Sequence, residues 1–298
     1  MGKYLDEAGL QHYTEKLKEY IGNEKVVIGE EEGTAYDGAK GKANADFIKD
    51  IQTKPTAAKD VVTPVMTGTW TVYNAAGVEQ TGMGGASVST LERGYQAAWN
   101  GSWKWTHDDS KADPTSISGS FGTNVPASGV AVQYPLNGTK VTANTTISVT
   151  VSATTKGGGW TLNGGYLQPV GASTKTHTAT TAVSFADRRY WGKTTTDTIT
   201  EAVIKSLSGS ELSNNGKSKT FSGLNLTDSE NYVFAYPASY GDVSVVTHTQ
   251  GGASFGVKDA FVKKQVEITN AAGAKVLYNV YCTTTPGKFK DNSTVAFS

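Results

Sequence analysis

The clearest strand pattern in the chain is Thr146-Ile147-Ser148-Val149-Thr150-Val151-Ser152. Aliphatic and hydroxyl side chains alternate along it, and because successive side chains of a β-strand point to opposite faces, the three aliphatic residues share one face. An aliphatic face needs a core to cover it, whereas a face of Ser and Thr tolerates water. The stretch therefore predicts a sheet with one buried and one wet face, as in a β-sandwich.

Further strands and turns are expected on both sides of this stretch. Residues 69–73 alternate in the same way and run into the turn Asn74-Ala75-Ala76-Gly77. Glycine- and asparagine-rich turn sequences then recur at short intervals, at 137–138, 157–159, 163–165, 214–216 and 251–252. Short strands separated by such turns indicate sandwich or barrel modules.

The expected secondary structure is most detailed in the C-terminal part. Four strands are expected, at 231–237, 243–248, 265–269 and 275–281, and one short helical stretch at 199–207. The last two strands are joined by Asn270-Ala271-Ala272-Gly273, the same four letters as at 74–77. This recurrence indicates shared turn chemistry, with Gly at a position that needs a positive φ.

Composition and charge restrict the class of protein. The chain has 298 residues, 27 Lys+Arg against 27 Asp+Glu, and only 18% charged residues. This balanced and sparse charge argues against a nucleic-acid-binding protein that contacts phosphates through a basic surface. Its single cysteine, Cys282, excludes an intramolecular disulfide. Since neither a signal-peptide pattern nor a membrane-length apolar run is present, we expect synthesis in a cytoplasm and no membrane partner.

The first 60 residues differ from the rest, because they hold 21 of the 54 charged residues and sum to −3. An amphipathic helix is predicted from about Asp6 to Ile21. Its apolar face, a candidate partner-docking surface, comprises Leu10, Tyr13, Leu17, Tyr20 and Ile21. A second segment repeats small and apolar residues every four positions: Ala35, Ala39, Ala43, Phe47 and Ile51. Such a seam suits a close-packed bundle of copies, so these five are candidate oligomerisation residues.

Catalytic chemistry is hard to find in the sequence. The stretch 252–256 matches the G-x-S-x-G nucleophile elbow, but all four histidines precede Ser254, whereas in that family the triad histidine follows the serine. The histidines are scattered singly and so indicate no zinc site, and the acidic residues at 108, 109 and 113 lack the Gly and Glu of an EF-hand. We therefore expect no catalytic residues, no metal and no cofactor.

Three tryptophans allow two interpretations. Trp99, Trp103 and Trp105 lie close together, and a strand would place the last two on one face. Aromatic residues on one strand face usually belong to a core, while exposed indoles beside polar groups suit stacking on sugar rings. The three are thus either core residues or candidate carbohydrate-binding residues.

Several stretches resemble structural proteins of tailed bacteriophages. Residues 3–10 and 16–21 resemble the opening segment of such proteins, and 34–41 resemble the oligomerising segment that follows it there. Arg188-Arg189-Tyr190-Trp191-Gly192, Leu207 and residues 232–241 resemble a β-module at the ends of phage tail and head appendages, whose terminal hairpin matches 266–269 and 276–281. The middle, about 69–187, is similar in style to immunoglobulin-like modules.

The resemblance implies a mainly β virion protein, made in the host bacterial cytoplasm. It implies an N-terminal docking helix and loop (1–30), a short oligomerisation helix and linker (31–68), one or two Ig-like β-sandwich modules (69–187) and a C-terminal β-rich appendage module (188–298). The implied function is a non-enzymatic, trimeric head or tail fibre attached by its N-terminus to a capsid or tail protein. The alternatives are a carbohydrate-binding receptor-recognition protein of the tail, which contacts a host surface glycan, and a bacterial surface adhesin.

Overall fold

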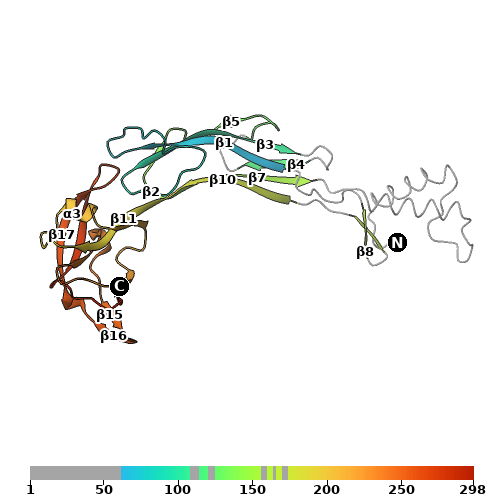
Figure 1. Ribbon diagram of the computed structural model, residues 1–298. Helices are drawn as coiled ribbons and strands as arrows, with labels where there is room; N and C mark the ends of the chain where they lie inside the picture. The colour runs from blue at the N-terminus through green and yellow to red at the C-terminus, as the bar shows by residue number, and fades with distance from the viewer. Residues whose placement is uncertain (1–61, 108–113, 120–124, 156–159, 164–165, 170–173) are drawn as a thin grey trace, which may run out of the picture. The chain divides into compact units, whose positions relative to one another are not determined.

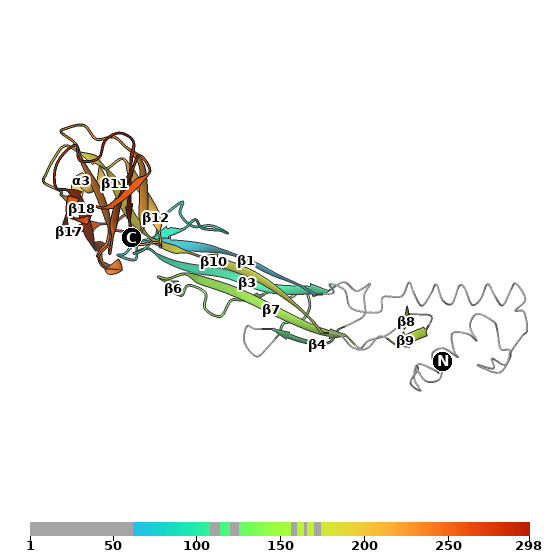
Figure 2. The ribbon, with the colours of Figure 1, turned by 90° about the horizontal axis from the view of Figure 1, so that it is seen from below.

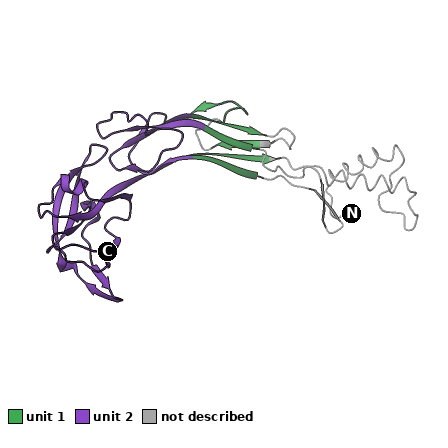
Figure 3. Ribbon diagram, in the orientation of Figure 1, with its two compact units in different colours: residues 1–66, 102–135, 148–180 green, residues 67–101, 136–147, 181–298 purple. Residues whose placement is uncertain are grey.

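The computed structural model describes residues 62–107, 114–119, 125–155, 160–163, 166–169 and 174–298, and this part is mainly β. The expected mainly β class is therefore confirmed, while the N-terminal helix and the bundle segment lie outside the described residues. The chain divides into two compact units (Figure 3). Unit 1 comprises residues 1–66, 102–135 and 148–180, and unit 2 comprises 67–101, 136–147 and 181–298.

The middle part of the chain forms two sheets, which appear as two layers in Figure 1. One sheet has the order β1-β3-β5, with β6 pairing β3, and the other has the order β10-β7-β4. The bounds are β1 Val62–Tyr73, β3 Gln96–His107, β4 Pro114–Gly119, β5 Val132–Gln133, β6 Lys140–Val141, β7 Thr145–Thr155 and β10 Thr174–Val183. β8 (Trp160–Asn163) and β9 (Tyr166–Pro169) form a separate two-stranded sheet. Figure 2 shows β1, β3, β7 and β10 running alongside one another.

The alternating residues 146–152 belong to β7. Val149 and Val151 have no exposed surface, and Ala153 has 1%. They pack in the core of unit 1 against side chains of the other sheet, among them Trp103 and Trp105 of β3. Side chains of both sheets thus meet in this core, and the predicted strand at 146–152 with its aliphatic face buried is confirmed.

The C-terminal part is a second sandwich with sheet orders β12-β11-β14-β18-β17 and β13-β19-β15-β16, and β2 pairs β11 in parallel. The strands are β2 Leu91–Glu92, β11 Phe185–Thr194, β12 Gly209–Ser213, β13 Lys219–Leu224, β14 Asn231–Pro237, β15 Val246–Gln250, β16 Ala253–Gly256, β17 Phe261–Thr269, β18 Lys275–Thr283 and β19 Ser293–Phe297. The helices are α3 (Glu201–Lys205) and two single 3₁₀ turns, η1 (Ala238–Tyr240) and η2 (Lys258–Ala260).

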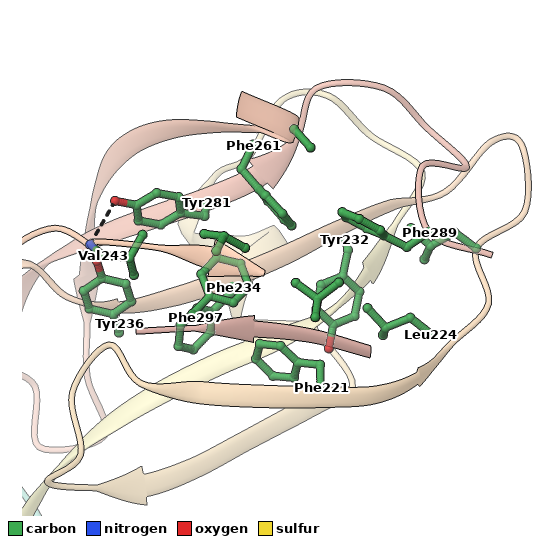
Figure 4. Close-up of a cluster of buried hydrophobic side chains, with 14 residues drawn as sticks. Phe221, Leu224, Tyr232, Phe234, Tyr236, Val243, Phe261, Tyr281, Phe289 and Phe297 are labelled. Carbon is green, nitrogen blue, oxygen red and sulfur yellow. Dashed lines mark hydrogen bonds between the residues drawn. The ribbon is translucent and has the colours of Figure 1, made fainter. Parts of the chain in front are cut away.

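β14 has an apolar run instead of an alternation because both of its faces are buried. Phe234 and Tyr236 face a core shared by the two sheets, which also contains Phe221 of β13 and Phe297 of β19 (Figure 4). The rings of Phe234 and Phe297 have centroids 4.9 Å apart. On its other face, Val233 and Ala235 pack in a second core with residues of α3 and β18.

The two Asn-Ala-Ala-Gly sequences form the same turn. In each, the Asn side chain accepts hydrogen bonds from the second and fourth following N–H groups, and the Gly has φ of 82° or 81°. The predicted turn chemistry and positive φ are therefore confirmed. The turns also meet each other, since the Ala75 N–H donates to the Ala272 carbonyl oxygen at 2.9 Å.

The expected C-terminal strands are present with changed ends. Those at 231–237 and 275–281 begin as expected, the one at 265–269 is the second half of β17, and β15 begins at Val246 instead of 243. The helical stretch shortens to α3, whose N-cap Thr200 accepts a hydrogen bond from the Val203 N–H. The boundary expected between 187 and 188 falls inside β11.

Candidate functional site

The predicted attachment and oligomerisation residues cannot be placed in the fold. Leu10, Tyr13, Leu17, Tyr20 and Ile21, and likewise Ala35, Ala39, Ala43, Phe47 and Ile51, lie outside the described residues. These two sets remain predictions from the sequence. The same applies to the acidic loop residues at 108, 109 and 113.

The three tryptophans are core residues. Trp99 and Trp103 are 2% exposed and Trp105 is 6% exposed. The Trp105 indole N–H donates to the Pro126 carbonyl oxygen at 2.8 Å, inside unit 1. Because stacking on a sugar ring requires an open indole face, the carbohydrate-binding interpretation of these residues is wrong, and the core interpretation is confirmed.

Glycines make room for the Trp99 indole in unit 2. A Cβ atom at Gly68 would lie 2.5 Å from Trp99 Cζ2, and one at Gly101 would lie 2.5 Å from Trp99 Cη2. Real side chains do not approach so closely, so Trp99 packs directly over the backbone of both glycines. The ring is held in place and is not available to a ligand.

The structure instead presents a hydroxyl-lined face on the outer side of the β10-β7-β4 sheet. It lies in unit 1 and consists of Ser116 and Ser118 of β4, Thr150, Ser152 and Thr154 of β7, and Thr174, Thr176 and Thr178 of β10. Three hydroxyl pairs connect β7 to β10: Thr150 with Thr178 at 3.0 Å, Ser152 with Thr176 at 2.8 Å, and Thr154 with Thr174 at 2.7 Å. This set is called the hydroxyl face below.

The hydroxyl face has a regular geometry without charge. Strand geometry places its residues about 6.6 Å apart along a strand and about 4.8 Å apart across strands. None of its eight members is ionisable, and each hydroxyl can both donate and accept a hydrogen bond. The sequence indicated the hydroxyls of β7, but which strands lie beside β7 was not evident from local pattern.

Charged groups gather instead on β11 of unit 2, where they neutralise one another. The Arg189 side chain is 8% exposed, and its guanidinium donates to Glu211 Oε1 at 2.7 Å and to the Gly216 and Ser218 carbonyl oxygens. Lys219 donates to the same carboxylate at 2.8 Å. Hydrogen bonding, first from Lys219 and then from Arg189, lowers the pKa of Glu211 against an opposing effect of burial. This cluster stabilises the chain between β12 and β13 and leaves no unpaired cation.

A second group on the same strand involves Arg188 and Glu92. Arg188 Nε donates to Glu92 Oε2 at 3.0 Å, and the Glu92 side chain is 3% exposed. Glu92 Oε1 is buried and has no hydrogen-bond partner among the described residues. The neighbouring Tyr190 has a raised pKa, mainly through burial and secondarily through the Glu92 charge. The arrangement joins β2 to β11.

Ser254 does not lie in a nucleophile elbow. It belongs to β16, which pairs antiparallel with β15, whereas the elbow is a turn from a strand into a helix. Its hydroxyl pairs with the Thr249 hydroxyl at 2.7 Å, and the imidazole of His248 lies on the opposite face of the hairpin. The G-x-S-x-G match is therefore a glycine-rich hairpin.

The described residues provide neither a metal-binding cluster nor a membrane-spanning helix. No group of three or more His, Cys, Asp or Glu side chains there is arranged to hold a metal ion. Among the helices of that part, none is long and apolar enough to cross a membrane.

Comparison with known proteins gives no relative, because no family model, no curated protein and no solved structure matches the chain.

Proposed function

We propose that the chain is a non-enzymatic fibre protein of a tailed bacteriophage virion, attached to the capsid or tail by its N-terminal residues and projecting its β-modules outward. The observation that supports this most is where the resembling segments of the C-terminal part lie. Residues 188–192, 232–237 and 276–281 belong to β11, β14 and β18, which are neighbours in one sheet. Leu207 packs in the core on one face of that sheet. These segments are far apart in the sequence and adjacent in one sheet, and this adjacency supports the proposal.

The middle sandwich suits a spacer. β1 and β3 have 12 residues each and β7 has 11, longer than the usual strand of about 5–6 residues. At about 3.3 Å per residue, a 12-residue strand spans about 40 Å. We take this sandwich to be of the immunoglobulin-like type and the assembled fibre to be a trimer held by the alanine seam.

The attachment proposal is tested on the virion. Leu10→Glu with Leu17→Glu places charge on the predicted docking face, whereas Glu15→Ala with Lys18→Ala changes only the opposite face. Virions carrying the first pair of changes should lack the protein after purification, and those carrying the second should retain it. Equal incorporation of both variants would contradict the proposed attachment. Electron microscopy of particles labelled on this protein then shows whether it sits on the head or the tail.

The hydroxyl face favours a second candidate function, contact with a neutral host surface glycan. A surface of paired hydroxyls without charge offers donors and acceptors to sugar hydroxyls and offers nothing that selects an ionised ligand. The variant Ser152→Ala, Thr176→Val and Thr178→Val removes three hydroxyls at nearly constant volume. It should lose binding on a glycan array, while Thr220→Val, at an exposed threonine of β13, should not. An array without signal for the unchanged protein would exclude this candidate.

A further inference from the structure

The hairpin of β15 and β16 is an exposed edge of the C-terminal sandwich. β16 ends the sheet β13-β19-β15-β16, and all four of its residues are exposed. The hairpin turns through Gly251 and Gly252, whose φ values of 59° and 82° suit a two-residue turn. β16 therefore has β15 on one side and, within the described part of the chain, no strand on the other (Figure 1).

Backbone hydrogen-bonding groups point outward from this edge. In antiparallel pairs, residues that exchange hydrogen bonds alternate with residues that do not. The two-residue turn makes Gln250 and Ala253 a bonded pair, and the Val257 N–H donates to the Val246 carbonyl oxygen at 2.7 Å. By this alternation, the N–H and C=O groups of Ser254 and Gly256 point away from β15. They form a row of two donors and two acceptors along the outer edge.

Phe255 adds an apolar contact to the same edge. It is directly opposite His248, so both side chains lie on one face of the sheet. His248 in turn is opposite the buried Val295, and its ring lies 5.1 Å from that of Phe289 in the core between the sheets. Phe255 thus continues the inner, core-forming face of the sheet outward, yet it is 60% exposed.

The other outer strands of this sandwich carry charges, which hinder the addition of another strand. β12 contains Glu211, β13 contains Lys219, and β17 contains Lys263 and Lys264. In contrast, residues 250–257 (Gln-Gly-Gly-Ala-Ser-Phe-Gly-Val) include no charge and no proline. Two copies of this stretch can approach each other without like-charge repulsion.

We propose that β16 pairs antiparallel with β16 of a second copy of the chain, about a twofold axis at Phe255. In this register Ser254 faces Gly256 of the second copy and exchanges two hydrogen bonds with it, and the symmetric pair adds two more. Phe255 then faces Phe255 of the second copy in a non-bonded pair, where side chains lie closest and an aromatic pair is favourable. The outward backbone groups and the exposed ring are satisfied together, and the two sheets become one.

The surface is independent of the proposed N-terminal trimer, because it involves only residues of unit 2. A strand of four residues buries less than the roughly 800 Å² per partner of a stable interface. We therefore expect weak pairing that becomes effective where many copies are held close together, as on a particle. Loss of this pairing leaves the attachment experiment unaffected, so the two proposals fail separately.

Sedimentation velocity of the full chain tests the association. The unchanged protein should form species larger than its basic oligomer as its concentration rises to about 1 mM, the dissociation constant expected for such a weak contact. Phe255→Lys should raise that dissociation constant at least tenfold. Leu277→Lys, at a leucine that is 48% exposed on the inner strand β18, should not change it. The pairing is refuted if the unchanged protein shows no association beyond its basic oligomer or if both variants behave alike.

Cysteine cross-linking tests the register. The native Cys282 is buried, and burial raises the pKa of its thiol, so an introduced surface cysteine dominates the reaction with oxidised glutathione. Phe255→Cys should give a disulfide-linked pair of chains, because residue 255 faces itself across the axis. Ser254→Cys and Leu277→Cys should cross-link at least tenfold more slowly. Faster cross-linking at 254, or none at 255, would overturn the proposed pairing.

Discussion

Replacing Asn270 by Ala should destabilise the protein more than replacing Asn74 by Ala, although each begins an Asn-Ala-Ala-Gly turn. The two side chains make the same local bonds, each with Oδ1 accepting from two N–H groups of its turn at 2.9–3.0 Å. Asn270 is only 7% exposed, and its Nδ2 also donates to the Arg93 carbonyl oxygen at 2.6 Å. The pair is therefore a control for local turn chemistry within one chain.

The expected magnitudes follow from burial. Around Asn74, water replaces the lost acceptor, so the change should cost about 1 kcal/mol, the usual net value of a hydrogen bond. Around Asn270, the Ala272 N–H and the Arg93 carbonyl oxygen lose their partner where water is largely excluded, and an unsatisfied buried group costs about 1–3 kcal/mol. We expect about 3 kcal/mol for Asn270→Ala, a difference of about 2 kcal/mol between the two variants.

Urea unfolding measured by far-UV circular dichroism tests this difference. Both turns lie in unit 2, so the two variants are compared on the unfolding transition of unit 2. That transition is identified as the one that a substitution in the C-terminal core also shifts. Asn→Asp at each site distinguishes the contribution of the Oδ1 acceptor from that of the Nδ2 donor, because the substitution retains Oδ1 and removes the donor. Asn270→Asp should remain destabilised and Asn74→Asp should be close to unchanged. Equal losses of unfolding free energy at the two positions would refute the reasoning.

Four further substitutions should have defined effects. Phe234→Ala, at a side chain with no exposed surface, should cost about 3–5 kcal/mol, whereas Leu277→Ala, at a 48% exposed leucine, should cost less than about 1 kcal/mol in the same urea assay. Burial and the hydrogen bond to Asp187 raise the pKa of Tyr240 to about 12, so its contribution to stability should be complete below pH 10 and lost as the pH rises from 10 to 12. Tyr240→Phe should reduce that alkaline slope in thermal unfolding, and an unchanged slope would contradict the assignment. The lowered pKa of Glu211 acts in the opposite direction, so stability should fall as the pH drops below 4.5, less steeply in Glu211→Gln.

Local patterns were sufficient for the individual strands. The alternation at 146–152 predicted both the strand and its buried face, because a period of two determines which side chains share a face. The apolar run at 231–237 predicted a strand, and the structure explains why it lacks alternation, since cores lie on both of its sides. Ends were less predictable, because hydrogen bonds to distant segments extend or shorten a strand.

The tryptophans show what local patterns leave undetermined. Spacing placed Trp103 and Trp105 on one face of a strand, and both lie in the same core. Whether that face is buried depends on the opposing sheet, whose β7 side chains are more than 40 residues away in the chain. An indole suits a core and a sugar-binding surface equally well, so its own residue type could not decide. Local sequence was likewise insufficient to predict the hydroxyl face, because that face exists only where β4, β7 and β10 are neighbours in one sheet.

The two Asn-Ala-Ala-Gly turns show which features depend on the local sequence and which depend on residues far away in the chain. Identical letters gave identical turns, because an Asn side chain and a glycine with positive φ suffice to close the loop. Their contact, through the Ala75 N–H and the Ala272 carbonyl oxygen, joins residues almost 200 positions apart, and no local feature indicates it. The contact also places one turn against residues 93–95 in the interior of unit 2 and leaves the other at its surface. The same four residues therefore have one conformation and two expected contributions to stability.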